Sequence, residues 1–186
     1  MKKIIFLPIL FLLVACGPSP EEIADQERLE LKRRNCLSIN KLGTSTVKED
    51  SRNLGLELSV QCENFLNPKI LVIDVIKVES DKSTADVFRV FFQIAENLEG
   101  KQFDKVYLAS KGKNKLYIEG EYFGVLGSSF SYQNPVYLLR TFPENTHTLD
   151  GKKAFPTWTG GLIGVTSKQM EDLNSLARDW FIEDLL

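Results

Sequence analysis

The sequence predicts an α+β fold, in which two main helices pack on a mainly antiparallel sheet of short strands, preceded by a helical spacer. Two observations lead to this prediction. Short segments that alternate apolar and polar residues, or that are rich in β-branched residues, occur in pairs separated by turn residues, as in hairpins. Two longer segments, between Ser83 and Gly100 and from Thr166 to Phe181, place apolar residues at helical spacing.

The chain begins with a short apolar segment that follows two lysines. Lys2 and Lys3 precede a run over residues 4–14 that is interrupted only by Pro8. This run is shorter than the ~20 residues that a membrane-spanning helix needs. A basic start, an apolar run of this length and small residues at its end form the pattern of a secretory signal peptide. We therefore expect residues 1–15 to be removed, and they are left out of the predicted fold.

The end of this run, Leu13-Val14-Ala15-Cys16, resembles the lipobox of bacterial lipoproteins. The resemblance concerns only the first sixteen residues. It implies that Cys16 receives a diacylglyceryl group, that cleavage follows Ala15, and that Cys16 becomes the acylated first residue. Gly17 stands where an Asp tends to retain such proteins in the inner membrane, so the implied location is the outer membrane, facing the periplasm. The alternative is that Cys16 is an ordinary thiol.

The chain after the signal peptide suits one domain with a sizeable core, because it has about 170 residues. We expect a lipidated tether and helical spacer over residues 16–35 and a single globular α+β domain over residues 36–186. Without Lys2 and Lys3, 21 basic residues stand against 25 acidic ones, a net charge of about −4. This charge does not favour binding to nucleic acid.

Cys36 and Cys62 are the only cysteines after Cys16. Secretion would place them in an oxidising compartment, where an even pair usually forms a disulfide, so the sequence predicts a Cys36–Cys62 bond. No Cys-x-x-Cys is present and His147 is the only histidine. We therefore expect neither a metal site nor a cofactor.

The helical spacer is predicted to start after Ser19 and to reach about Asn35. Ser19 suits a helix cap, Pro20 suits the first turn, and Glu22 completes a capping box. Acidic residues come early in this segment and basic residues late, which complements the helix dipole. Its apolar residues do not line one face, so we expect a helix surrounded by solvent.

The segment after the spacer is predicted as a short strand over residues 37–41 and a polar loop over residues 43–53. Alternation over residues 56–62 and β-branched residues over residues 70–78 then predict two strands. The two strands are candidates for a hairpin.

A helix over residues 84–99 is followed by a second predicted hairpin. Its strands are residues 105–110 and 115–122, and its turn is residues 111–114. A short helix is predicted to open at Asn134-Pro135 and to close at Phe142-Pro143.

A polar loop is predicted over residues 144–153, and the last helix is predicted to be capped by Thr166. In that helix Gln169 completes a capping box, and Val165 with Met170 forms a hydrophobic staple.

The candidate binding surface combines aromatic and basic residues. Residues 122–139 and 154–167 contain no charged side chain but several aromatic ones, and aromatic residues are favoured anchors at interfaces. The turn of the second hairpin supplies lysines that suit anionic lipid or an acidic partner. Core packing and an ordinary soluble turn are the alternatives. The candidate residues are Tyr122, Phe123, Tyr132, Trp158, Lys111 and Lys113.

Two features raise the possibility of catalysis. Glu119 and Glu121 flank Gly120 on a predicted strand, so both carboxylates would face the same side, an arrangement that can hydrolyse glycans. Two solvated carboxylates are the alternative. His147 is the only imidazole available to a Ser-His-Asp triad, but it lies in a predicted polar loop. We therefore assign no catalytic residue.

The leading hypothesis is a non-catalytic outer-membrane lipoprotein with a periplasmic domain that binds a protein or an envelope component. An assembly accessory factor and an inhibitor of an incoming enzyme would both fit. A small envelope glycan hydrolase and a purely structural lipoprotein are the alternatives. An exposed aromatic patch would favour the first, a deep cleft lined with carboxylates the second, and a featureless charged surface the third.

Overall fold

The computed structural model describes residues 19–185, so the lipobox and Cys16 lie outside the described residues. The elements, in chain order, are α1 (Pro20–Glu49), η1 (Ser51–Asn53), β1 (Leu56–Glu63), β2 (Asn67–Val78), α2 (Thr84–Asn97), β3 (Lys105–Ser110), β4 (Lys113–Glu119), α3 (Gly120–Ser129), α4 (Pro135–Thr141), η2 (Pro143–Asn145), β5 (Thr146–Thr148), α5 (Leu162–Ala177), η3 (Arg178–Ile182, a π-helix) and α6 (Glu183–Leu185).

The strands form one sheet in the order β1-β2-β3-β4-β5. The pairs β1–β2, β3–β4 and β4–β5 are antiparallel, whereas β2 and β3 are parallel. Both predicted hairpins are present, and α2 is the crossover that a parallel pair of strands requires. The predicted α+β class with a mainly antiparallel sheet is confirmed, although β2, at 12 residues, is longer than a short strand.

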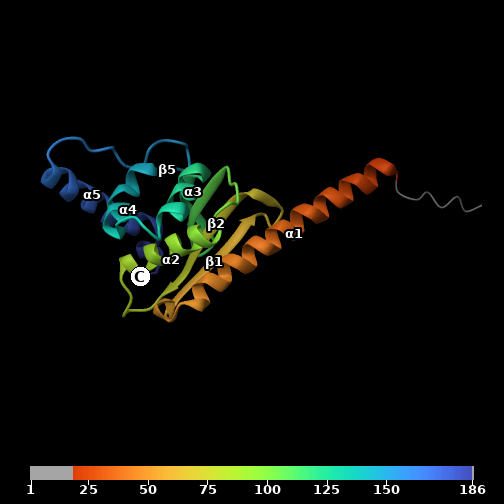
Figure 1. Ribbon diagram of the computed structural model, residues 1–186, viewed down its shortest axis with the longest axis horizontal. Coiled ribbons are helices and arrows are strands. Elements are labelled where there is room, and N and C mark those ends of the chain that lie inside the picture. The colour runs from red at the N-terminus through yellow and green to blue at the C-terminus, as the bar shows by residue number, and fades with distance from the viewer. Residues whose placement is uncertain (1–18, 186) are drawn as a thin grey trace, which may run out of the picture.

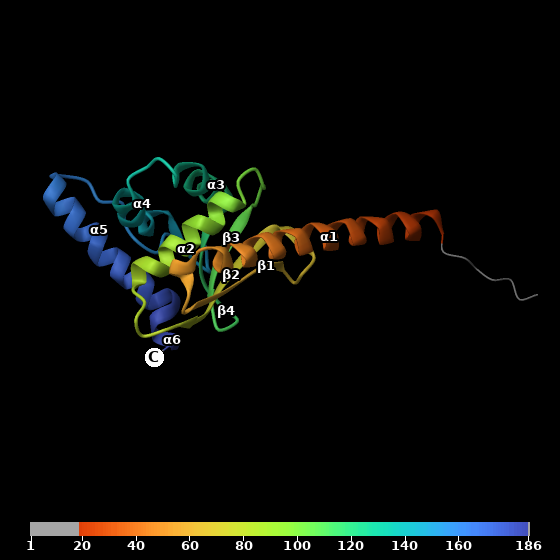
Figure 2. The ribbon, with the colours of Figure 1, turned by 60° about the horizontal axis from the view of Figure 1, so that its bottom comes forward.

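The core lies between one face of the sheet and the helices (Figures 1 and 2). Alternate strand residues point into it, as the period of a half-buried strand requires. The strand residues in the core are Leu56, Leu58, Val60, Cys62, Leu71, Ile73, Val75, Val106, Leu108, Leu116 and Ile118.

Aromatic side chains of α2 fill the centre of the core. Phe88 and Phe91 each pack edge-to-face on Trp180 of η3, with ring centroids 5.7 and 5.6 Å apart. The Trp180 indole also donates a 2.9 Å hydrogen bond to the carbonyl of Ala109 in β3. The end of the long C-terminal helix is thereby fixed to both α2 and the sheet.

Helix α1 is longer than predicted, and the strand and loop expected over residues 37–53 are wrong. The helix continues for 30 residues to Glu49, and the 3₁₀-helix η1 follows. Its buried residues Cys36, Ile39, Gly43 and Val47 recur every three or four positions, so one face of the helix packs on β1. Gly43 interrupts the apolar pattern in the sequence but is needed there, because its missing side chain leaves room for Val60.

The first half of α1 is exposed to solvent along its whole length. Every residue from 20 to 35 is exposed, and Cys36 is the first buried one. This part of the helix is about 24 Å long at 1.5 Å per residue. Figure 1 shows it extending away from the sheet and the other helices. We refer to residues 20–35 as the arm.

The predicted disulfide is confirmed. Cys36 and Cys62 are bonded, with their Cα atoms 5.6 Å apart. Cys36 is the first buried residue of α1 and Cys62 lies near the end of β1, so the bond fixes the helix to the sheet at the base of the arm.

The predictions for the second half of the chain are correct for β3, β4, α4 and most of α5, but they miss α3 and β5 and misplace several boundaries. Strand β4 ends at Glu119, and residues 120–129, predicted in part as strand, form α3. Gly120 permits this change, because a Cβ there would collide with the carbonyl of Phe103. The short helix α4 is confirmed. The loop predicted over residues 144–153 contains η2 and β5.

The last helix begins four residues before the predicted cap. Gly161 precedes its first residue, Leu162, and Thr166 lies inside α5, so the proposed capping box and staple are wrong. The predicted apolar face is buried from Leu173 to Phe181, whereas Met170 is partly exposed. Among residues 19–185 there is no helix with the length and apolar character that crossing a bilayer would require.

Alanine substitutions at two glycines, one in the contact between α1 and β1 and one outside it, are expected to have opposite effects on stability. A Cβ on Gly43 would lie 2.5 Å from Val60 Cγ1, so Gly43→Ala is expected to destabilise the fold by about 1–3 kcal/mol. Gly124, in α3, has open space around it, so Gly124→Ala is expected to stabilise the fold by up to ~1 kcal/mol through helix propensity. Urea denaturation of both variants measures this difference. Equal stability of Gly43→Ala and the native chain would show that the helix does not approach the strand closely.

The disulfide predicts a large loss of stability on reduction. The cysteines are 26 residues apart, and closing a loop of this size in the unfolded chain is worth roughly 3.5 kcal/mol. Reduction of the disulfide, or replacement of both cysteines with Ala, should lower the free energy of unfolding by about this amount. The double variant is its own control, because reductant should not affect it. A further loss on adding reductant to this variant would contradict the assignment.

Candidate functional site

The structure separates the aromatic residues of the predicted binding surface. Tyr132 is 72% exposed in the loop between α3 and α4, whereas Phe123 is only 2% exposed and lies in the core against Phe91. Tyr122 is half-buried against Phe142, and this burial raises the pKa of its phenol. Trp158 is also half-buried and donates a 2.6 Å hydrogen bond to Asp172 of α5. Of these four aromatics, Tyr132 is the one free to contact a partner.

Lys111 and Lys113 are exposed at the turn between β3 and β4, away from Tyr132. The positive φ angles of Lys111 and Gly112 form this turn. The turn is held down by Asp74 of β2, whose carboxylate accepts a 2.9 Å hydrogen bond from the Gly112 amide. Tyr132 instead follows Ser131, which donates to Glu96 near the end of α2, at the opposite end of the sheet. The aromatic and basic residues therefore do not form one surface.

Glu119 and Glu121 do not form the expected carboxylate pair. Glu119 is the last residue of β4 and precedes α3, while Glu121 is in the first turn of that helix. The alternation that would place both on one strand face ends at Gly120. This geometry gives no support to a hydrolase that uses these two residues.

His147 lies in a strand, not in a loop. It pairs with Tyr117 across β4 and β5, and the two rings stack with centroids 5.1 Å apart. Lys105 approaches Tyr117 from β3, its Nζ 3.9 Å from the ring centroid. These contacts, on the sheet face opposite the core, explain why Tyr117 is buried. A strand of only three residues is too short to show a period in the sequence.

Exposed apolar residues gather on α4 and on the first turn of α5. Leu162 and Ile163 are 73% and 88% exposed, and Val136 and Tyr137 of α4 are also exposed. The two helices contact each other, and Arg140 donates to Gln169 between them. Both figures show that α5 starts at the end of the molecule opposite the start of α1. We refer to these two exposed patches, Val136 with Tyr137 on α4 and Leu162 with Ile163 on α5, together as the far-end surface.

A groove of about 320 Å³ lies beside α4, between that helix and α2. Phe92, Phe130 and Leu139 give it an apolar lining. Its charged residues are Arg89 and Arg52, and Arg52 pairs with Asp50 at 2.6 Å. Arg89 is held in place by a 2.5 Å contact with Asp86. Hydrogen bonds from Ser83, together with Arg89, lower the pKa of Asp86 to about 2. The charges at the groove are thus already paired within the protein.

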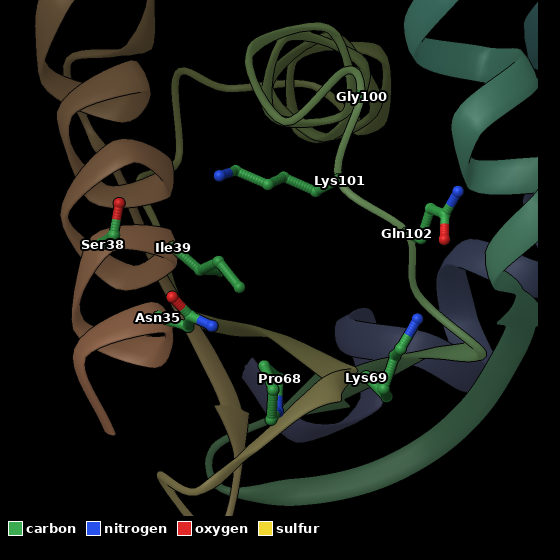
Figure 3. A pocket seen from close by; sticks show the side chains of 8 residues that line it. All are labelled: Asn35, Ser38, Ile39, Pro68, Lys69, Gly100, Lys101 and Gln102. Atoms are coloured by element: carbon green, nitrogen blue, oxygen red, sulfur yellow. The ribbon is translucent and has the colours of Figure 1, made fainter. Parts of the chain in front are cut away.

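A more polar pocket, of about 360 Å³, lies at the base of the arm (Figure 3). In Figure 3 the side chains of Ile39 and Lys101 point into the space between α1 and the loop before β3, whereas the amide of Gln102 points away from α1. Its lining residues are Asn35, Ser38, Ile39, Pro68, Lys69, Gly100, Lys101 and Gln102. This site was not predictable from the sequence, because its lining residues come from three segments that are far apart in the chain.

The described part of the chain offers no group of His, Cys, Asp and Glu residues suited to a metal ion. No protein-family model, curated protein or solved structure matches this chain.

The buried carboxyl of Asp74 is expected to lower the free energy of unfolding in a pH-dependent way. Its carboxyl is buried, one oxygen lacks a hydrogen-bond partner, and desolvation raises its pKa. The pKa of Asp74 in the folded state exceeds its unfolded value of ~3.9. The loss of stability is therefore absent below both pKa values and develops as the pH rises from the unfolded pKa through the folded one. Asp74→Asn keeps an acceptor for Gly112 without burying a charge. This variant should be more stable than the native chain at pH 7, and the gain should shrink toward pH 3.

Urea denaturation across this pH range tests the expectation, with Asp150→Asn as the control. Asp150 is exposed, and its hydrogen bonds with Lys152 and Thr148 lower its pKa, so its replacement should bring no gain at pH 7. A gain for Asp74→Asn that does not change with pH would contradict the argument.

Proposed function

We propose that this chain is an outer-membrane lipoprotein, anchored through Cys16, with a periplasmic domain that acts as a non-catalytic binding module for a protein. The observation that carries this proposal is the arm. A helix exposed on all sides leaves the body at the end opposite the far-end surface, and a disulfide fixes it at its base. Such a helix holds a domain at a distance from whatever is attached to its N-terminus.

The lipobox supports a lipid as the attachment. The arm begins a few residues after Cys16, so its length would separate the body from the membrane surface by about 24 Å. Stable anchoring requires more than one acyl chain, which an acylated N-terminal cysteine supplies.

The far-end surface supports a protein as the partner. Its residues are large and apolar, and the first turn of α5, like residues 131–137, contains no charged side chain. Exposed apolar patches on soluble domains mark sites of protein contact, since covering them with another apolar surface releases water. With the lipid at one end of the molecule, this surface would face away from the membrane.

Replacing Cys16 tests the anchor. Cys16→Ser is expected to abolish incorporation of labelled palmitate and to move the chain from the membrane fraction to the soluble fraction. Cys36→Ser is the matched control, because it also removes a thiol but should keep the label. Continued labelling of the Cys16→Ser variant would contradict lipidation at this residue.

Site-specific photo-crosslinking in intact cells tests the partner surface. A photoreactive residue at Ile163 or Tyr137 should give one discrete adduct with another protein. The same residue at Phe65, which is 61% exposed but lies in the turn between β1 and β2, should not. Equal adducts from Phe65 would contradict the proposed surface. An adduct between two copies of this chain, identified by mass spectrometry of its peptides, would contradict a different protein as the partner.

A further inference from the structure

We infer that the pocket at the base of the arm binds a small anionic molecule, namely an oxyanion carried on a polar group of about the size of a sugar. This site is separate from the far-end surface and does not depend on the protein partner proposed above.

The charge of the pocket favours an anion. Lys69 and Lys101 are its only charged lining residues, and no carboxylate lines it, although the chain as a whole has a net charge of −2. Among residues 19–185, neither lysine lies in an ion pair. An ammonium group is a compact positive charge with three donors, suited to phosphate or carboxylate oxygens.

The remaining polar groups favour a hydroxylated carrier for that anion. Asn35 offers an amide donor and acceptor, and Ser38 offers a hydroxyl. Asn35 and Ser38 are three residues apart on α1 and therefore lie on the same side of the helix. The volume of about 360 Å³ equals that of about twelve water molecules at ~30 Å³ each. This space exceeds that of a bare ion and lies at the lower end of the range for ligand pockets.

The walls of the pocket are fixed by contacts already present in the protein. Cys36, bonded to Cys62, directly follows Asn35, and the next lining residue of α1, Ile39, is buried in the core. The opposite wall is held by a 2.7 Å hydrogen bond from the Asp104 amide to the Lys69 carbonyl, and by a 3.0 Å bond from the Lys101 amide to the Leu98 carbonyl. The backbone of the pocket is therefore preformed, and the ordering cost of binding a ligand falls on the exposed lysine side chains.

Titration of the full-length chain in neutral detergent micelles tests this inference. The probes are glucose 6-phosphate, glucuronate, inorganic phosphate and uncharged glucose. Calorimetry and amide chemical shifts measure the binding of each probe. We expect saturable millimolar binding of the two anionic sugars, weaker binding of phosphate, and none of glucose. Added salt should weaken the binding of the anions.

Two pairs of substitutions locate the binding. The double variant Lys69→Gln with Lys101→Gln should weaken glucose 6-phosphate binding at least tenfold. Lys111→Gln with Lys113→Gln removes the same charge from the distant hairpin turn and should change the affinity less than twofold. Asn35→Ala with Ser38→Ala, on an exposed helix face that tolerates Ala, should weaken binding of the sugar phosphate but leave that of inorganic phosphate unchanged.

Competition distinguishes the sources of the anion. Displacement of glucose 6-phosphate by phosphatidylglycerol vesicles, but not by phosphatidylcholine vesicles, would identify a lipid headgroup. Displacement by glucuronate alone would identify a carboxylated glycan. Three results would overturn the inference: glucose binding as tightly as its phosphate, an equal loss of affinity in the hairpin variant, or no saturable binding of either anionic sugar.

Discussion

The close contact between α1 and β1 is the constraint on which the rest of the structure depends. At Gly43 the helix backbone approaches Val60 so closely that no side chain fits between them. The Cys36–Cys62 bond joins the same two elements nearer to the arm. This contact covers the core face of β1, which is an edge strand of the sheet. It also sets the direction in which the arm leaves the body. The stability of the core and the orientation of the arm therefore have the same physical cause.

The same contact gives the two ends of the molecule different chemistry. Where α1 leaves the sheet, polar residues of the helix face lysines of β2 and of the loop before β3, and a solvent-filled pocket results. At the other end, α4 and α5 pack on each other while leaving apolar side chains outside. A polar ligand and an apolar protein surface would be recognised at separate places. Because α2 lies between these regions and its apolar face is buried in the core, the body is expected to act as one rigid unit.

The features predictable from the sequence were those encoded by local periodicity. The strands 56–62 and 105–110 and helix α2 each follow one period over their length, and the disulfide joins the two cysteines that follow Cys16. The end of α1 was not predictable in this way, because Gly43 and Thr46 occupy its buried stripe and both disfavour a helix interior. The pocket was not predictable from the sequence either, because its residues come from three segments that meet only after folding. Glu119 and Glu121 illustrate a third limit, since one tertiary contact at Gly120 changes strand to helix between them.

The arm has few interactions of its own, so its rigidity must come from the packed half of α1. Its capping box joins Ser19 and Glu22, and Glu30 pairs with Arg33 at 3.0 Å. A cap is worth about 1 kcal/mol and an exposed pair about 0.2–0.5 kcal/mol, whereas an isolated helix of this length is only marginally stable in water. Forming the first turn is the costly step, and the residues held against β1 have already formed it. The arm is therefore most rigid beside Cys36 and progressively less so toward Ser19, which would let an anchored body keep a fixed base while its attachment to a membrane remains flexible.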